Sequence, residues 1–252
     1  MNIENNNTYS AKSPSGDLGI RNLVKRFGNK TALDVSELNI EKGTLLGLVG
    51  NNGAGKTTLF RLILDLLKAD EGYVLSKGAD VSKSEDWKTY TGSFIDNRFL
   101  IEFLTPEEYF SFVGETYGLN KEAVHERLQP FGRFMNNEIL GQKKYIRNFS
   151  AGNKQKIGIM AAMMIRPEIL ILDEPFNFLD PSSQIEIRDM ILKMNQELNT
   201  TVLISSHNLN YTTDISSRVV LLEKGIVKKD LNNSPEAIAE LNAYFIQQAS
   251  VI

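Results

Sequence analysis

Short apolar runs and longer amphipathic runs alternate along the chain. Residues 18–40 contain short apolar or alternating runs broken by the turn FGNK, a pattern that predicts a small antiparallel strand layer. Residues 44–49 form an apolar run that predicts a strand and ends in a glycine-rich turn. Between positions 57 and 67, apolar residues recur at the spacing of a helix, which the turn-like sequence ADEG then ends. The glycine-rich turn therefore lies between a strand and a helix.

A long stretch of helical character occupies the middle of the chain. Residues 97–166 are rich in helix formers and contain no convincing strand, so we expect a helical subdomain there. Beyond it, strand-like runs alternate with one helical pattern, an order that predicts a parallel sheet. The strands are expected at 169–172, 201–205 and 219–222, and the helix at 182–198.

The two ends of the chain differ from this centre. Residues 1–17 are polar, lack the apolar core of a signal peptide and predict a disordered tail. Ser234 and Pro235 have the character of an N-cap and a first helical position, so a C-terminal helix is expected within 231–252. The remaining segments, 18–96 and 167–230, are expected to form one α/β core.

The composition of the chain agrees with the predicted strands and helices and excludes several classes of protein. With 252 residues, 42% of them hydrophobic and 23% charged, the chain is typical of a soluble globular protein with one substantial core. A net charge of -3 argues against a nucleic-acid partner. The absence of cysteine excludes thiolate chemistry and a disulfide framework. No run approaches the roughly 18 apolar residues that cross a bilayer, so any membrane spans would belong to other chains.

The glycine-rich turn carries the first chemical motif. The sequence GNNGAGKT at 50–57 matches the P-loop pattern, whose backbone amides and helix N-terminus bind phosphate groups. Lys56 is expected to reach the β- and γ-phosphates of ATP, and Thr57 to ligate Mg²⁺. The other residues expected to contact the nucleotide are Asn51, Asn52, Gly53, Ala54, Gly55 and Thr58.

Two carboxylates follow the apolar run 169–172. In open α/β sheets the carboxyl ends of the strands bind ligands, so Asp173 and Glu174 are placed for function. Beside a P-loop, Asp173 is expected in the Mg²⁺ shell and Glu174 as the group that polarises the attacking water. A similar pair without a P-loop is more often a solvated strand end.

A second motif gives a family resemblance. FSAGNKQK at 149–156 resembles the signature sequence of ABC ATPases, with Ser150 and Gly152 kept, whereas Ala151 and Asn153 occupy positions at which that family varies. Read without the family, Ser150 is a good N-cap for the helix that follows. The resemblance implies that Ser150, Gly152 and Asn153 contact the γ-phosphate bound by a partner cassette.

Further matches to the ABC ATPases follow in family order. NFLD at 177–180 resembles the loop that crosses the dimer interface, and His207 occupies the position of the switch histidine that contacts the γ-phosphate. Phe27 matches the aromatic that stacks on adenine, although a place in the core is the alternative. A lone histidine is usually a surface or capping residue, and His125 is interpreted in that way.

One position departs from the family pattern. Where ABC ATPases usually have a glutamine that ligates Mg²⁺ and senses the membrane partner, this chain has Asp96. Some cassettes resembling antibiotic-peptide and lantibiotic-immunity exporters carry glutamate there, and an aspartate is a hard oxygen ligand suited to Mg²⁺. Aspartate lacks the amide donors of glutamine and adds negative charge. A shift of the alignment by one or two residues would leave Asp96 structural.

The resemblance implies a two-lobed ABC nucleotide-binding domain, a P-loop NTPase with a mixed α/β core and a helical subdomain. Two such cassettes, identical or different, would sandwich two ATP molecules. We expect the ATPase subunit of an exporter, peripheral on the cytoplasmic face of the membrane and docked on separate membrane-spanning subunits. The alternatives are a soluble, non-transport ABC ATPase and a module that senses ATP without hydrolysing it.

An aromatic-rich run suggests where the membrane subunit binds. Residues 94–117 include Phe99 and Phe103 directly after position 96, where the family builds a groove for a coupling helix. We expect Phe99 or a neighbour to be partly exposed in the isolated chain. The alternative is that all these aromatics belong to the core of the helical subdomain.

Overall fold

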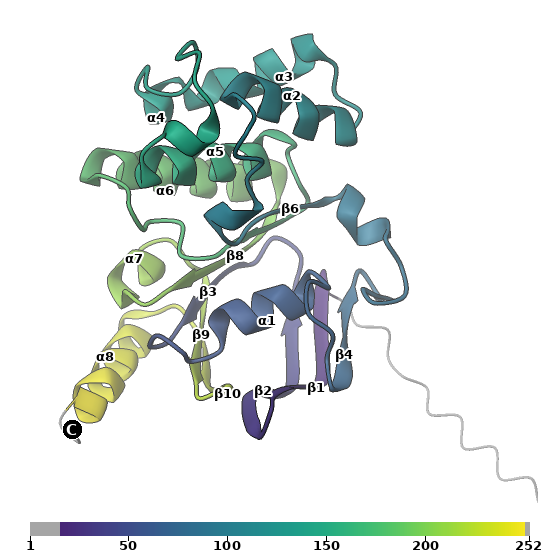
Figure 1. The fold of residues 1–252 in the computed structure, drawn as a ribbon. Helices are drawn as coiled ribbons and strands as arrows, with labels where there is room; N and C mark the ends of the chain where they lie inside the picture. The colour runs from purple at the N-terminus through teal and green to yellow at the C-terminus, as the bar shows by residue number, and fades with distance from the viewer. Residues whose placement is uncertain (1–15, 250–252) are drawn as a thin grey trace, which may run out of the picture.

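The computed structural model describes residues 16–249 (Figure 1). The predicted tail lies outside these residues except for Gly16 and Asp17. Asp17 is buried, and its carboxylate accepts a hydrogen bond from the hydroxyl of Thr201 at 2.5 Å. Asp17 is therefore part of the folded core, one residue before the first strand.

A six-stranded sheet forms the centre of the molecule. Its order is β10-β9-β3-β8-β7-β6, and all neighbouring pairs are parallel except β9 with β10. The strands are β3 (Leu45–Val49), β6 (Thr91–Phe94), β7 (Ile169–Leu172), β8 (Thr201–Ser206), β9 (Arg218–Glu223) and β10 (Ile226–Asn232). The predicted strands and the parallel sheet are confirmed. The sequence did not reveal β6, which has only four residues, or β10, whose side chains are exposed or half-buried.

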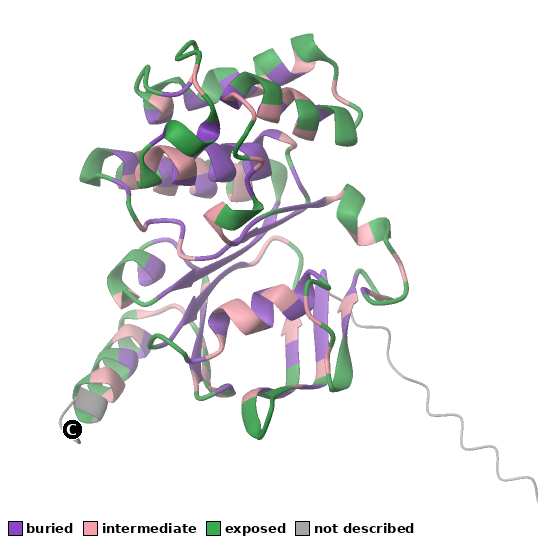
Figure 2. Cartoon of the chain, in the orientation of Figure 1, coloured by how far each residue is buried: buried purple, intermediate pink, exposed green. Residues whose placement is uncertain are grey.

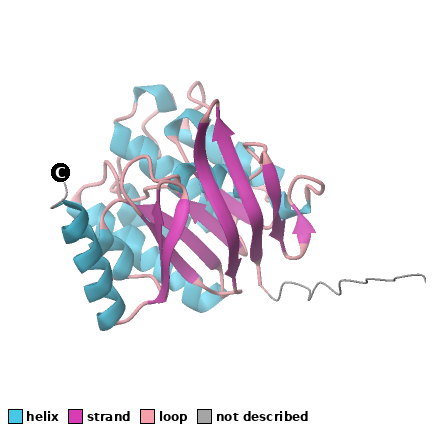
Figure 3. Cartoon of the chain, turned by 90° about the horizontal axis from the view of Figure 1, so that it is seen from below, coloured by secondary structure: helices cyan, strands magenta, loops and turns pink. Residues whose placement is uncertain are grey.

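A second sheet covers the α1 side of the first (Figure 3). It is antiparallel, in the order β2-β1-β4-β5, as expected for residues 18–40. Its strands are β1 (Leu18–Phe27), β2 (Lys30–Ile40), β4 (Glu71–Ser76) and β5 (Ala79–Asp80). Helix α1 (Lys56–Ile63) lies between the two sheets, because its apolar face and residues of both sheets form one core cluster.

The central strands of the six-stranded sheet are buried (Figure 2), and the two core clusters show that β7 is covered on both faces. Ile169 and Ile171 pack in the cluster that contains α1, whereas Leu170 and Leu172 pack in the cluster that contains the helical layer. Side chains alternate between the faces of a strand, so a strand covered on both sides reads as a continuous apolar run. The carboxyl end of β7 is thereby fixed from two sides.

Residues 97–166, where a helical subdomain is expected, contain helices and no strand. The helices are α2 (Pro106–Thr116), α3 (Lys121–Leu128), α4 (Gly132–Met135) and α5 (Ala151–Met164). Helix α5 packs directly on β6 at Gly158, where a Cβ atom would lie 2.0 Å from the ring of Phe94. The subdomain is therefore joined to the core by a contact that leaves no space for a side chain.

Three helices complete the chain: α6 (Pro181–Leu198), α7 (Leu209–Thr213) and α8 (Pro235–Ala249). The predicted C-terminal helix is confirmed, since Ser234 accepts a hydrogen bond from the amide of Ala237 at 3.2 Å and Pro235 is the first helical residue. Leu241 of α8 belongs to a core cluster that includes Val49 at the end of β3. Within the described part of the chain, no helix is both long enough and apolar enough to span a bilayer.

Candidate active site

The glycine-rich turn runs from the end of β3 to the start of α1. Gly53 and Gly55 have φ angles of 80° and 107°, a region in which side chains are strained. At Gly55 a Cβ would also lie 2.9 Å from the carbonyl oxygen of Ala32. The amide of Ala54 donates to the carbonyl of Asn51 at 3.0 Å, which closes the turn. The glycines thus allow the loop to curl over the N-terminus of α1.

Lys56 is the first residue of α1 and only 6% exposed. Its ammonium donates to the carbonyl of Gly50 at 2.6 Å and lies 3.4 Å from a carboxylate oxygen of Glu174. These contacts hold a buried cation at the centre of the loop, where a phosphate oxygen would take the place of the loop acceptors.

Asp173 follows the last residue of β7 and faces the start of α1. Its Oδ2 accepts a hydrogen bond from the Thr57 hydroxyl at 2.5 Å, and its other oxygen accepts one from Ser205. Burial raises the pKa of Asp173 above the ordinary value, although the two hydroxyl donors oppose this shift. The oxygens of Thr57 and Asp173 converge and are the hard donors that Mg²⁺ prefers, so the residues fit this ion.

Glu174 stands in a strained backbone position beside Asp173. Its φ is 49°, in the left-handed region that non-glycine residues seldom adopt and that clusters at functional sites. Two hydrogen bonds fix the backbone of Glu174: its amide donates to the Ser205 hydroxyl at 2.9 Å, and its carbonyl accepts from the Gln155 side-chain amide at 3.1 Å. The side chain points to His207, with Oε2 lying 2.8 Å from Nδ1. The carboxylate is thus held between His207 and Lys56.

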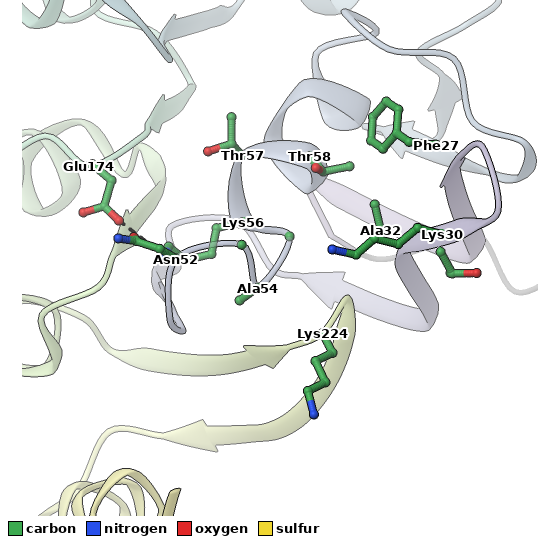
Figure 4. Close-up of a pocket in the computed structure, with 13 residues that line it drawn as sticks. Phe27, Lys30, Ala32, Asn52, Ala54, Lys56, Thr57, Thr58, Glu174 and Lys224 are labelled. Carbon is green, nitrogen blue, oxygen red and sulfur yellow. Dashed lines mark ion pairs between the residues drawn. The ribbon is translucent and has the colours of Figure 1, made fainter. Parts of the chain in front are cut away.

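The loop and Glu174 line one open cavity of about 430 Å³. In Figure 4, Lys56 and Glu174 meet at one end of this cavity and Phe27 lies toward the other. Phe27 is 52% exposed, so the alternative place in the core is wrong. The full lining is Phe27, Lys30, Thr31, Ala32, Asn52, Gly53, Ala54, Gly55, Lys56, Thr57, Thr58, Glu174 and Lys224.

Most of the sequence-predicted contact residues therefore meet in this cavity, but some lie apart. Asn51 borders a neighbouring cavity with Tyr244 and Phe245 of α8. His207 and Asp173 do not line the cavity themselves, but each contacts a residue that does: His207 contacts Glu174, and Asp173 accepts a hydrogen bond from Thr57.

The signature residues lie outside the cavity. Ser150 caps α5 by accepting a hydrogen bond from the amide of Asn153 at 3.2 Å, as the local interpretation expected. None of Ser150, Gly152 and Asn153 is among the residues that line the cavity, within the part of the chain that the structure describes. A Cβ at Gly152 would lie 2.6 Å from the carbonyl oxygen of Phe178, so this glycine admits the loop that precedes α6.

Asp96 follows β6 by two residues and faces Arg98. Its Oδ2 accepts hydrogen bonds from the Arg98 guanidinium at 2.9 and 2.6 Å, and Oδ1 accepts one from the Arg98 amide at 2.9 Å. These bonds hold the pKa of Asp96 below its ordinary value. No hydrogen bond joins Asp96 to Thr57 or Asp173 in residues 16–249. The metal-binding role of Asp96 stays a prediction.

Sequence reasoning missed several residues of the site. Ser205 binds both Asp173 and the amide of Glu174, and its place as the last residue of the predicted strand TVLIS was the available signal. Gln155 lies inside the signature segment but was not singled out. Lys30 lines the cavity from the start of β2 and Lys224 from the turn between β9 and β10, and neither belongs to a motif that predicts this.

Comparison with known proteins identifies the family. The ABC transporter family matches residues 33–177 of this chain. The chain belongs to the ABC transporter family. It is an ABC-type ATPase cassette, the ATP-binding subunit of a transporter.

The individual relatives are transport ATP-binding proteins, and those whose names give a cargo differ in it. The uncharacterized ABC transporter ATP-binding protein YhcH of Bacillus subtilis is 32% identical, over 91% of this chain and 74% of that protein. The bacitracin transport ATP-binding protein BcrA of Enterococcus faecalis is 34% identical, over 84% of this chain and 68% of that protein. A probable sulfate/thiosulfate import ATP-binding protein, CysA of Chlorella vulgaris, is 30% identical, over 82% of this chain and 87% of that protein.

Solved structures confirm the two-lobed ABC fold. An ATP-binding subunit of an ABC transporter superposes with a TM-score of 0.77 at 27% identity, covering 85% of this chain and 89% of that one. A dimeric bacterial ABC transporter cassette gives a TM-score of 0.75 at 23% identity, over 86% and 99% of the two chains.

Proposed function

We propose that this cassette hydrolyses Mg²⁺-bound ATP in a composite site shared with a second cassette, identical or different, and so drives export through separate membrane-spanning subunits. The observation that supports it most is the meeting of Lys56, Glu174 and His207 beside the P-loop, while Ser150 lies outside that cavity. One chain thus carries the binding and hydrolytic groups and presents its signature residues to another chain.

Each residue of the site has a separate role in ATP hydrolysis. Lys56 neutralises charge on the β- and γ-phosphates, and the loop amides hold the phosphate oxygens. Glu174 accepts a proton from the attacking water, whose oxygen bonds to the γ-phosphorus as the bond to the β–γ bridging oxygen breaks. His207 orients the Glu174 carboxylate through their 2.8 Å contact. Mg²⁺, held by Thr57 and Asp173, would supply positive charge to the phosphate oxygens.

The adenine end of the nucleotide belongs at Phe27. This ring is exposed at the end of the cavity away from Glu174, and Lys25 lies 5.6 Å from its centroid. An exposed aromatic beside a phosphate-binding loop offers a flat apolar face for a purine ring.

Export is the direction that position 96 and the bacitracin relative favour, whereas the sulfate/thiosulfate relatives are named for import. An acidic residue at position 96 resembles the cassettes of antibiotic-peptide exporters, and BcrA is named for bacitracin transport. Exposed Phe99 and Phe103, directly after Asp96, provide an apolar surface for a helix of the membrane subunit. Docking there would place this chain at the cytoplasmic face of the membrane, as a peripheral subunit.

A complementation experiment tests the composite site. Lys56→Ala should lose ATP binding in its own P-loop, and Ser150→Arg should block the face offered to the partner's nucleotide. Each variant alone should be inactive, whereas a mixture should regain ATPase activity, because the mixed dimer keeps one site with an intact Lys56 and an intact Ser150. Lys88→Ala, on an exposed lysine remote from the site, should behave as wild type. A mixture as inactive as its components, although mixed dimers form, contradicts the proposal.

A further inference from the structure

A second cavity lies at the ends of three helices in and beside the helical subdomain. It has a volume of about 330 Å³, and no residue of the nucleotide cavity lines it. The end of α3, the following turn, the end of α5 and the end of α6 form its walls. The lining residues are Arg127, Pro130, Phe131, Met163, Met164, Arg166, Met190, Lys193, Met194, Glu197 and Leu198.

Methionine is concentrated at this cavity. The chain has seven methionines, and four of them line it: Met163, Met164, Met190 and Met194. Methionine side chains are flexible and polarizable, and they adapt to apolar ligands of different shape. Phe131 is buried, and Leu198 is 47% exposed at the rim. The apolar part of the cavity therefore suits a flexible hydrocarbon chain rather than one rigid molecule.

The charges around this apolar floor are unbalanced. Three cations, Arg127, Arg166 and Lys193, face it together with a single carboxylate, Glu197, which lies 3.9 Å from the Lys193 ammonium. Neither arginine forms an ion pair with a carboxylate among residues 16–249. Burial and then repulsion by Arg166 lower the pKa of Arg127, with a smaller opposing effect of Glu126. Both arginines thus line the cavity without an ion-pair partner in the described part of the chain.

The positive charge of Arg127 also stabilises the end of a helix, but this contact supplies no negative charge to balance the cations of the cavity. The Arg127 guanidinium donates to the carbonyl of Met164 at 3.4 Å, at the C-terminus of α5, where cations are favoured. That bond uses one of the five donors of the guanidinium. The others, and the guanidinium of Arg166, remain suited to a carboxylate or a phosphate.

We propose that this cavity binds an anionic amphiphile, a single alkyl or acyl chain that ends in a carboxylate or a phosphate. The head group lies between Arg127 and Arg166, and the chain lies against Met190 and Met194. The cavity volume falls in the range of small-molecule sites, roughly 300–1,000 Å³. This ligand is distinct from ATP, and its binding does not depend on the hydrolytic mechanism.

Methyl NMR of the full chain with labelled methionines tests the site. Decanoate and decyl phosphate, each below its critical micelle concentration, should shift the Met190 and Met194 methyl signals saturably and leave that of Met135 unchanged. Decanoate should bind up to about 15-fold more tightly than octanoate, at about 0.8 kcal/mol for each buried methylene. Both anions should raise the melting temperature, because they bind the folded chain. The absence of a saturable shift, or binding that is independent of chain length, overturns the proposal.

Variants separate the charge requirement from non-specific binding. Arg127→Gln combined with Arg166→Gln should weaken both anions at least tenfold and leave the weaker binding of 1-decanol unchanged. Arg133→Gln, on an exposed arginine of α4 outside the cavity, is the matched control and should bind as wild type. Arg166→Gln alone is the fallback if the double variant does not fold, since its side chain is exposed. Decanol that binds as tightly as decanoate, or variants that bind decanoate as wild type, contradict the proposal.

Discussion

Oε2 of Glu174 lies 2.8 Å from Nδ1 of His207, and the amide of His207 also donates to this oxygen at 3.3 Å. The two residues come from different strands, Glu174 from the loop after β7 and His207 from the loop after β8. Because β7 and β8 are parallel neighbours, their carboxyl ends bring the two side chains together. This geometry supports the proposal that His207 positions the Glu174 carboxylate.

Replacing His207 with Ala should slow hydrolysis and leave ATP binding intact. Without its partner, the Glu174 carboxylate loses the contact that orients it, and misplacement of a reacting group costs up to about 10²-fold in rate. Turnover and nucleotide affinity measured on the same preparation separate the two effects. His125→Ala removes an exposed histidine of α3 and serves as the control. Equal loss of binding and turnover in His207→Ala would show that His207 supports the fold instead.

Asp96 is held by Arg98 in this structure, and its predicted role concerns Mg²⁺. If Asp96 faces the metal during turnover, Asp96→Gln should change the Mg²⁺ dependence of hydrolysis and raise activity by removing a charge near the triphosphate. Asp96→Ala should weaken the Mg²⁺ dependence further, because no ligand remains. Asp86→Gln, in an exposed turn, is the control. Identical Mg²⁺ titration curves for wild type and both Asp96 variants would assign Asp96 a structural role.

Phe99 and Phe103 are 53% and 68% exposed, and Phe103 borders an open groove with Leu100 and Ile101. Truncating Phe103 or Phe99 to Ala should lower affinity for the membrane subunit by about 1–3 kcal/mol and uncouple transport from ATP hydrolysis. The cassette itself should fold and hydrolyse ATP.

The control for this prediction is Phe112→Ala, which removes a ring of similar exposure on α2. Coupling can be measured as the ratio of transport to hydrolysis in the assembled transporter. A structure of the assembled complex in which residues 94–103 contact only their own chain or solvent would refute the docking surface.

Gly158 fixes the helical subdomain to the core, because a Cβ there would lie 2.0 Å from the Phe94 ring. Gly158→Ala should lower the free energy of unfolding by about 1–3 kcal/mol, the usual cost of overpacking. Gly132→Ala, in α4 where a Cβ meets no atom within 4 Å, should instead be neutral or stabilise by about 0.4–1 kcal/mol. Urea unfolding measures both changes. Equal stability of the two variants contradicts a rigid contact at Gly158.

Motifs with strict spacing were readable from the sequence. The P-loop pattern predicted that Lys56 and Thr57 lie at the phosphate-binding turn, because the spacing of its glycines and its place between a strand and a helix specify the path of the backbone. The run ILIL predicted that Asp173 and Glu174 stand at the carboxyl end of a buried strand. Residues that join the site from other elements, such as Ser205 and Lys224, were not predicted, since their place follows from the sheet order and not from a local pattern.

The same distinction holds for the fold. The helical pattern of 97–166 and the apolar runs of the central strands follow from periodicity. β10 was missed because its side chains are exposed or half-buried and its pairing with β9 depends on backbone bonds. Asp17 was assigned to the tail because its hydrogen-bond partner, Thr201, is 184 residues away in sequence.

The rate of ATP hydrolysis by Glu174→Gln tests the central claim most directly. If Glu174 accepts the proton of the attacking water, glutamine, which is similar in shape but cannot accept it, should lower turnover at least 10²-fold, within the roughly 10²–10⁴ of general-base catalysis. ATP binding should persist, and the ATP-bound dimer should become more stable. Turnover above a tenth of the wild-type rate would contradict the account.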